Sequence, residues 1–250
     1  MSHHAPTAFR RPEPGPSARR DALVALLGLA LLAAWEAAGL DLPLVRLYGQ
    51  ASGFAWREHW LTARLLHDGA RQLGWACVAL LALSLWRPRL LLPALPGPQR
   101  LWWLATTLAC VALIPLLKRA SSTSCPWALA EFGGTVARHV PHWVLGLRDG
   151  GPGGCFPSGH ASTAFALLPG WFVLRHHAPG AARRLLAVVL AAGLLLAWVQ
   201  MMRGAHYLSH SLWTAWVCWS VGALSFHGTR AWQQRRTPAV LLAAEPGAGG

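Results

Sequence analysis

Three short stretches of the chain place histidine and basic side chains beside apolar sequence: LKRASSTSCPW, GGCFPSGHAS and RGAHYLSH. The third stretch spaces Arg203, His206 and His210 at i, i+3 and i+7, which puts them on one side of a continuous helix, although Gly204 makes a turn an equal alternative. An imidazole can attack phosphorus and form a phosphohistidine. His206 is therefore a candidate nucleophile, and His210 is a candidate to fix its tautomer through the second ring nitrogen.

The first stretch contains Lys118, the only lysine in the chain. A lysine ammonium is a compact charge that can contact a phosphate oxygen. Taken alone, a lysine at a helix end more often reaches toward the membrane interface. Lys118 is thus a candidate for binding phosphate only in combination with the histidines of the other two stretches.

The second stretch leads into an apolar run. Pro157 and Ser158 are typical of a helix start, where free first-turn N–H groups bind anions. His160 would lie in that first turn, next to a bound phosphate. A buried, hydrogen-bonded histidine without a catalytic role is an equal alternative for this motif on its own.

The composition indicates the elements that position these residues. The chain is 54% hydrophobic and only 12% charged, which is typical of a membrane protein. We expect an all-α integral membrane fold, with six transmembrane helices in one bundle and an interfacial helix between the first two. The spans are predicted at 22–40, 70–86, 101–117, 158–174, 185–202 and 208–226. The predicted domains are a disordered cytoplasmic tail over 1–20, a membrane domain over 21–230 and a cytoplasmic tail over 231–250.

Basic residues indicate the orientation. The arginines in short loops and tails close to helix ends favour the side of the N-terminus as the inner side. Both termini are then cytoplasmic, and the three polar stretches face outward, which in a bacterial inner membrane is the periplasmic side. A net charge of +13 would also suit nucleic-acid binding, but the arginines form no basic face, so we expect no nucleic-acid partner.

Together the three stretches resemble the type 2 phosphatidic acid phosphatases, which share their site with the vanadium haloperoxidases. The family pattern is a lysine followed by Arg-Pro, then Pro-Ser-Gly-His, then an arginine, a histidine and an aspartate. The resemblance covers residues 22–227, in the branch with CPW and GAH-x-x-SH segments. The chain carries the pattern as Lys118-x6-Cys125-Pro126, Pro157-Ser158-Gly159-His160 and Gln200-x5-His206-x3-His210.

Three positions depart from the family pattern. Cys125 and Gln200 stand where the family has arginine, and His210 stands where it has aspartate. Arg203 lies one turn from Gln200 and can supply a guanidinium from the same helix face, with Arg119 a weaker substitute for Cys125. Without such replacement the site would hold too little positive charge, and the chain would be a degenerate lipid-binding relative.

The resemblance implies a mechanism in which His206 attacks phosphorus and His210 orients it. His160 donates a proton to the leaving oxygen and then activates water. No metal and no cofactor is implied, and the substrate is a lipid phosphate or diphosphate from the outer leaflet, hydrolysed or transferred to another lipid. The groups expected to hold the phosphate oxygens are Lys118, Arg203, Ser158, Gly159 and Gln200.

Cysteines divide into two groups. Cys77, Cys110 and Cys218 lie inside apolar runs and are expected to be packing residues. Cys125 and Cys155 lie beside the outward-facing stretches, where an oxidising compartment permits a disulfide. Such a bond would join the first stretch to the second.

Two other classes fit parts of the pattern. His206 and His210 at i, i+4 could bind a metal in a membrane oxidase, although such sites need further ligands. A transporter is the second alternative, but the sequence contains no internal repeat, and its polar residues gather at helix ends on one face.

Overall fold

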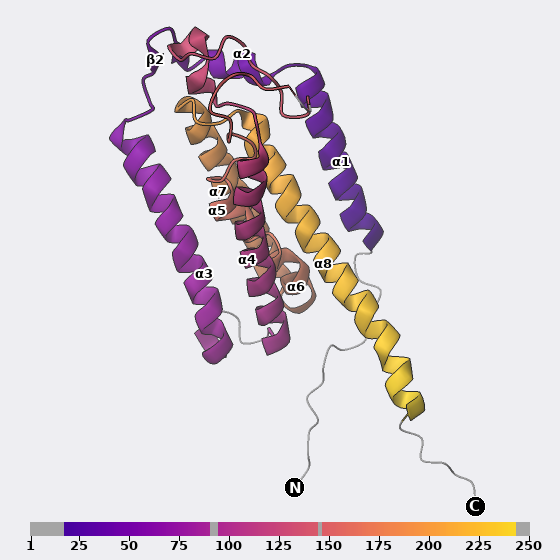
Figure 1. Cartoon of the computed structure of the whole chain (residues 1–250). Coiled ribbons are helices and arrows are strands. Elements are labelled where there is room, and N and C mark those ends of the chain that lie inside the picture. The colour runs from indigo at the N-terminus through magenta and orange to yellow at the C-terminus, as the bar shows by residue number, and fades with distance from the viewer. Residues whose placement is uncertain (1–17, 91–94, 145–146, 244–250) are drawn as a thin grey trace, which may run out of the picture.

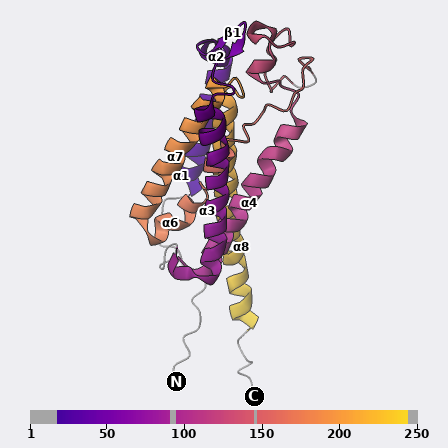
Figure 2. The ribbon, with the colours of Figure 1, turned by 90° about the vertical axis from the view of Figure 1, so that its left-hand side faces the viewer.

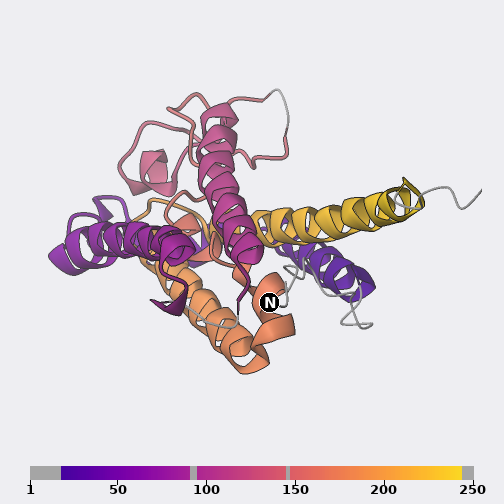
Figure 3. The ribbon, with the colours of Figure 1, turned by 90° about the horizontal axis from the view of Figure 1, so that it is seen from below.

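The computed structural model describes residues 18–90, 95–144 and 147–243. Nearly all of its regular structure is helical, and the long helices run side by side in one bundle (Figure 1). Seen from below, α3, α4, α7 and α8 surround a centre rather than forming a single layer (Figure 3). The all-α fold is confirmed. The long helices are α1 (Ala18–Ala37), α3 (Ala70–Trp86), α4 (Gly97–Ala120), α7 (Pro179–Met202) and α8 (Leu208–Ala243).

The surface of the bundle suits a lipid environment. Helices α4 and α7 are long and apolar enough to cross a membrane. Each has 24 residues, which corresponds to about 36 Å of helix against a hydrocarbon core of about 30 Å. Large apolar side chains also point outward, such as Leu27, 63% exposed, and Val188, 64% exposed. The chain is therefore associated with a membrane, while six crossings remain a prediction.

The predicted span 158–174 is broken. Its helical parts are α5 (Ser162–Phe165) and α6 (Gly170–His177), with a turn between them. Pro169 has no N–H to donate and cannot continue an α-helix. From Leu167 to Phe172 the backbone amides instead donate to carbonyls three residues earlier, as from Leu168 to Phe165 at 3.0 Å.

The helix ends differ from the predicted boundaries. Helix α1 begins at Ala18, within the tail predicted over 1–20, and α8 continues to Ala243, within the tail predicted over 231–250. The rest of the first tail, residues 1–17, lies outside the described residues. Helix α1 begins, and α8 ends, on the lower side of the molecule in Figure 1, away from α2 and β2.

The upper end of the bundle is built from short elements. The segment predicted as one interfacial helix is divided into α2 (Asp41–Arg46), the antiparallel pair β1 (Gly49–Gln50) and β2 (Gly53–Phe54), and the π-helix η1 (Leu61–Gly69) that runs directly into α3. Figure 2 shows α2 and β1 at the end of the bundle where α4 terminates. The remaining short elements are the 3₁₀ turns η2 (Pro88–Leu90), η3 (Pro126–Ala128) and η4 (Ala130–Phe132).

Apolar side chains fill the bundle in three clusters along its length. Close packing in the middle cluster depends on Gly193, because a Cβ there would lie 2.2 Å from the ring of Phe165. Representative buried members, from the lower cluster to the upper, are Trp103, Phe172 and Phe226, then Cys110, Phe165 and Cys218, then Phe54, Phe132 and Tyr207.

A buried ion pair joins α1, α6 and α8 at the lower end. Both carboxylate oxygens of Asp21 accept hydrogen bonds from Arg175, each at 2.7 Å, and Nε2 of His227 lies 2.8 Å from Asp21. The side chains of Asp21 and Arg175 are almost fully buried. Removing one partner would leave the other charge uncompensated in an apolar setting.

We therefore expect Asp21→Ala to destabilise the protein by about 3–5 kcal/mol, measured as a lower thermal unfolding midpoint in detergent. The matched control is Glu131→Ala, which removes the exposed partner of Arg46, a pair whose side chains are 40% and 51% exposed. The control should leave the midpoint nearly unchanged, because water screens an exposed pair. Equal losses in the two variants would contradict a stabilising role for the buried pair.

Candidate active site

The upper end of the bundle brings the three polar stretches together. Lys118 lies in the last turn of α4, His160 lies just before α5, and His206 lies in the turn between α7 and α8. The positive charges of Lys118 and of a protonated His160 both act on His206, and each lowers its pKa. The three residues therefore share one site.

A tight turn presents His206. Gly204 adopts the left-handed conformation with φ of +68°, so α7 does not continue into α8. The amides of Ala205 and His206 then donate back to the carbonyl of Gln200 at 2.9 and 3.3 Å. Arg203 and His206 consequently come from a helix end and a turn, which was one of the two alternatives for this stretch.

His206 is buried and neutral. Burial is the main cause that lowers its pKa to about 3, and the charge of Lys118 is the next. Its Nδ1 lies 3.6 Å from the sulfur of Cys155. A disulfide sulfur carries no proton and can only accept, which favours a proton on Nδ1 and a free lone pair on Nε2. A neutral imidazole with a free lone pair is the nucleophilic form.

That sulfur belongs to a disulfide between Cys125 and Cys155, with their Cα atoms 5.1 Å apart. The bond joins the loop after α4 to the loop before α5. The Cys155 sulfur also lies 3.2 Å from the carbonyl oxygen of Ala205, so the turn that carries His206 packs against the same bond. The backbone adds to the link, because the amide of Cys155 donates to the carbonyl of Thr123 at 3.0 Å.

His210 contacts the ring of His206 and the loop before α5. Its Nδ1 is 3.0 Å from the carbonyl oxygen of Cys155, and this oxygen can only accept, so the nitrogen donates. The rings of His206 and His210 meet edge to face with centroids 6.0 Å apart. The geometry gives His210 a packing contact with His206, in place of the hydrogen bond expected for orienting it.

The helix start predicted at Pro157 and Ser158 is wrong, whereas phosphate binding by Ser158 and Gly159 stays a prediction. The helix begins only at Ser162 and is four residues long. Ser158 is fully buried, and its amide donates to the carbonyl of His210 at 3.0 Å, so this amide is not free for a phosphate. Gly159 lies in open space at the wall of a groove and is the backbone group of this motif that remains accessible.

Cationic and polar groups lie at the same end of the bundle as His206. No hydrogen bond or ion pair engages the ammonium group of Lys118 among the residues that the structure describes. Arg203 donates from Nε to the carbonyl of Arg57 at 3.0 Å, and its Nη1 lies 3.5 Å from Oε1 of Gln200. Gln200 is 1% exposed, and its Nε2 has no partner within the described part of the chain. Arg119 is exposed, which leaves Arg203 as the better-placed guanidinium.

His160 is held by a residue that the motifs did not indicate. Its Nε2 lies 3.2 Å from the carbonyl oxygen of His67, and the two imidazole rings stack with centroids 3.4 Å apart. Burial lowers the pKa of His160 to about 4, with the neighbouring His67 as the next cause. His67 belongs to η1, in the stretch of mixed tryptophan, arginine and leucine where no motif singles out a residue.

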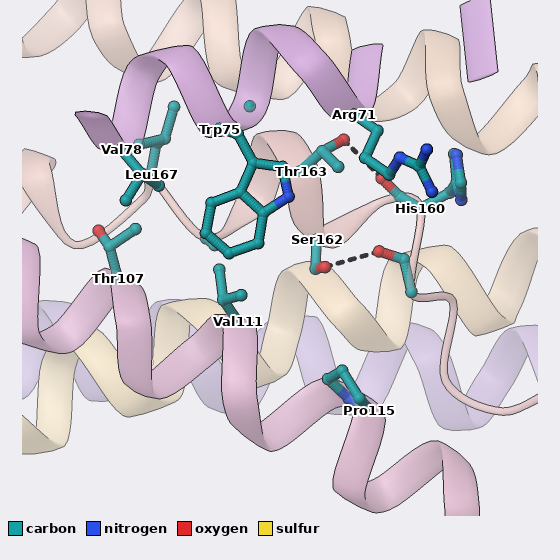
Figure 4. A pocket seen from close by; sticks show the side chains of 13 residues that line it. Arg71, Trp75, Val78, Thr107, Val111, Pro115, His160, Ser162, Thr163 and Leu167 are labelled. Carbon is teal, nitrogen blue, oxygen red and sulfur yellow. Dashed lines mark hydrogen bonds between the residues drawn. The ribbon is translucent and has the colours of Figure 1, made fainter. Parts of the chain in front are cut away.

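An apolar groove of about 240 Å³ leads to His160 between α3, α4 and α5 (Figure 4). Trp75, Val111 and Leu167 form its walls. Arg71 lines the groove as well, and Figure 4 shows its guanidinium beside His160. The groove therefore joins apolar surface to charged and titratable groups, as a lipid with an anionic headgroup would require.

The chain matches the PAP2 superfamily over residues 100–234, more than half of its length.

The chain belongs to the PAP2 superfamily.

The resemblance inferred from the motifs is thereby confirmed. In fold, this PAP2 protein is similar to the crystal structure described as the first transmembrane PAP2-type phosphatidylglycerolphosphate phosphatase from Bacillus subtilis. The TM-score is 0.50 at 17% sequence identity, over 86% of this chain and 96% of the other. No curated protein matches the sequence significantly. The PAP2 match leaves out residues 18–99, and therefore His67 and Arg71.

A metal does not fit the nucleophile of this PAP2 protein in its oxidised form. The potential ligand atoms of Cys125, Cys155 and His206 lie within 4.8 Å of one another. Both sulfurs are bonded to each other, however, and metals bind the thiolate form of cysteine. Among the described residues, His210 is not part of this group of potential ligands.

The disulfide should stabilise the PAP2 site as a unit. We expect Cys125→Ser to lower stability by about 3–4 kcal/mol, the range for a closed loop of this length, and to lower activity because the turn carrying His206 loses its support. Thermal unfolding and phosphate release, each with and without reductant, measure the two effects. Cys77→Ser, a free cysteine on α3, is the matched control and should change neither. A non-reduced peptide map without a 125–155 cross-link would contradict the bond itself.

Proposed function

We propose that this PAP2 protein is a membrane phosphatase that hydrolyses a lipid phosphate or diphosphate through a phosphohistidine on His206. The observation that carries the proposal is a neutral, buried His206 on which the charge of Lys118 acts, together with His160 in the wall of an apolar groove. A nucleophile, a cation and an acid–base group are the parts that this chemistry needs. The groove adds a place for the lipid.

In the first step, the lone pair on Nε2 of His206 forms a bond to phosphorus as the bond to the leaving oxygen breaks. Lys118, Arg203 and the free amide nitrogen of Gln200 hold the other phosphate oxygens. His160 gives its proton to the leaving oxygen, which departs as an alcohol or a lipid phosphate. In the second step, His160 takes a proton from water, and the hydroxide displaces His206 from phosphorus to release inorganic phosphate.

The substrate itself brings His160 into its acidic form. Burial keeps the pKa of His160 near 4 in the empty site. A phosphate dianion close to the ring favours the charged imidazolium and raises this pKa. The general acid is therefore charged when an anion occupies the site and neutral when the site is empty.

The proposed orientation places the site at the outer face of the inner membrane. Its support is that Ala18 and Ala243 lie at the end opposite the site, together with the arginines of the loops at that end. The Cys125–Cys155 disulfide agrees with an oxidising compartment.

The proposal is tested by hydrolysis of a panel of lipid phosphates and diphosphates by the purified protein. We expect His206→Ala to reduce phosphate release at least about 10³-fold, since removing a nucleophile abolishes the covalent path. His177→Ala, at the opposite end of the bundle, is the control and should retain activity. Vanadate should inhibit phosphate release and a chelator should not, whereas the reverse pattern would contradict a metal-independent phosphohistidine. Undiminished release by His206→Ala would dismiss the nucleophile.

A separate variant tests whether Arg203 replaces the missing family arginines. We expect Arg203→Ala to lower kcat/KM by about 10²–10³-fold and Arg203→Lys to recover part of the loss, because the phosphoryl group needs a cation at this point. Steady-state kinetics on the best lipid of the panel measures the effect, with Arg119→Ala as the exposed control. Turnover by Arg203→Ala close to that of the unaltered protein would exclude the replacement.

A further inference from the structure

We propose that His67 is a positioning residue of the reaction, which fixes the ring of His160 at the groove mouth and limits the stacked pair to one proton. The inference rests on the proposed function, because it concerns the same acid–base group. It assigns a role to a residue outside the three family motifs.

His67 holds His160 by two separate contacts. Its backbone carbonyl accepts the proton on Nε2 of His160 at 3.2 Å. Its ring lies over the ring of His160 with centroids 3.4 Å apart and planes 14° from parallel. The carbonyl fixes the tautomer, so that Nδ1 of His160 exchanges the proton with the leaving oxygen, and the stack fixes the plane in which the ring lies.

The backbone of η1 places both contacts. This segment is a π-helix, whose wider turn changes the direction of side chains relative to an α-helix, and such turns are frequent at functional sites. The hydroxyl of Thr62 anchors its start by donating to the carbonyls of Trp56 and His59 at 2.5 and 3.1 Å. At its end, Nδ1 of His67 lies 3.0 Å from a carboxylate oxygen of Asp68. The segment is thus held at its start by Thr62, and the ring of His67 is held at Nδ1 by Asp68.

Charged groups face this pair from every element around it. These are Asp68 on η1, Arg71 in the first turn of α3, Arg203 at the end of α7 and Lys118 at the end of α4. Only Asp68 favours a proton on His67, while the cations disfavour a proton on either ring.

Two charges on rings in van der Waals contact repel strongly. The pair therefore takes up its protons in two well-separated steps. With Asp68 bound to His67, the first proton favours His67, and a proton reaches His160 only at lower pH or when a phosphate anion binds beside it. If His67 cannot titrate, the first proton that the pair takes up should bind to His160.

The test is His67→Phe, which retains the stacked ring and the backbone carbonyl but cannot be protonated. We expect the basic limb of the kcat/KM profile to move about 0.5–1 pH unit upward, because His160 then stays protonated to higher pH. His67→Ala, which also removes the stack, should lower kcat at least about tenfold with KM little changed, since His67 does not touch the substrate. His59→Phe, an exposed histidine on the same stretch, is the control and should leave the profile in place.

An NMR titration, which does not depend on enzymatic turnover, separates this inference from the proposed function. In the protein labelled with ¹⁵N-histidine, NMR titration should find His67 and His160 titrating as a coupled pair, and His160 titrating at higher pH in His67→Phe. Independent titration of the two rings, or an unchanged profile in His67→Phe, would overturn the positioning role while His206→Ala still tests the phosphatase. Absence of any lipid phosphatase activity with a coupled titration intact would overturn the proposed function alone.

Discussion

The active end of the molecule depends on one covalent contact, the Cys125–Cys155 disulfide. Segments from three distant parts of the sequence meet at it: the loop after α4, the loop before α5 and the turn that carries His206. A position where the family has arginine is here part of this link. A covalent constraint thus stands where the family pattern has a charge, and in the proposed mechanism the positive charge at phosphorus comes from Lys118 and Arg203.

Burial sets the protonation of the histidines in the empty site. The pKa values of His206 and His160 are lowered to about 3 and about 4, in both cases mainly because the rings have lost contact with water. For His206 this is the state required of a nucleophile. For His160 it means that, in the proposed reaction, the ring becomes charged only when an anion binds beside it. Under that proposal, ligand binding and protonation of His160 are coupled.

Sequence alone predicted the helical fold and the placement of Lys118, His160 and His206 at one end of it, because family motifs and apolar runs are local patterns. The prediction from sequence failed where contacts with distant parts of the chain determine the local structure. The helix expected through 158–174 is interrupted because Pro169 cannot donate the hydrogen bond that an α-helix needs, although its neighbours are apolar. The amide of Ser158 is taken by a carbonyl from another helix. His67 reaches the site only through the wide turn of a π-helix, which has no signature in a single sequence.

Lys118 has a consequence beyond phosphate binding. It is the only lysine among 250 residues, and no partner among the described side chains engages it. Apart from the chain terminus, a reagent directed at primary amines meets a single target in this protein, and that target lies at the reacting end of the bundle. Occupancy of the site can thus be followed by protection of one amine from acylation, without a mutation and without an assay of product.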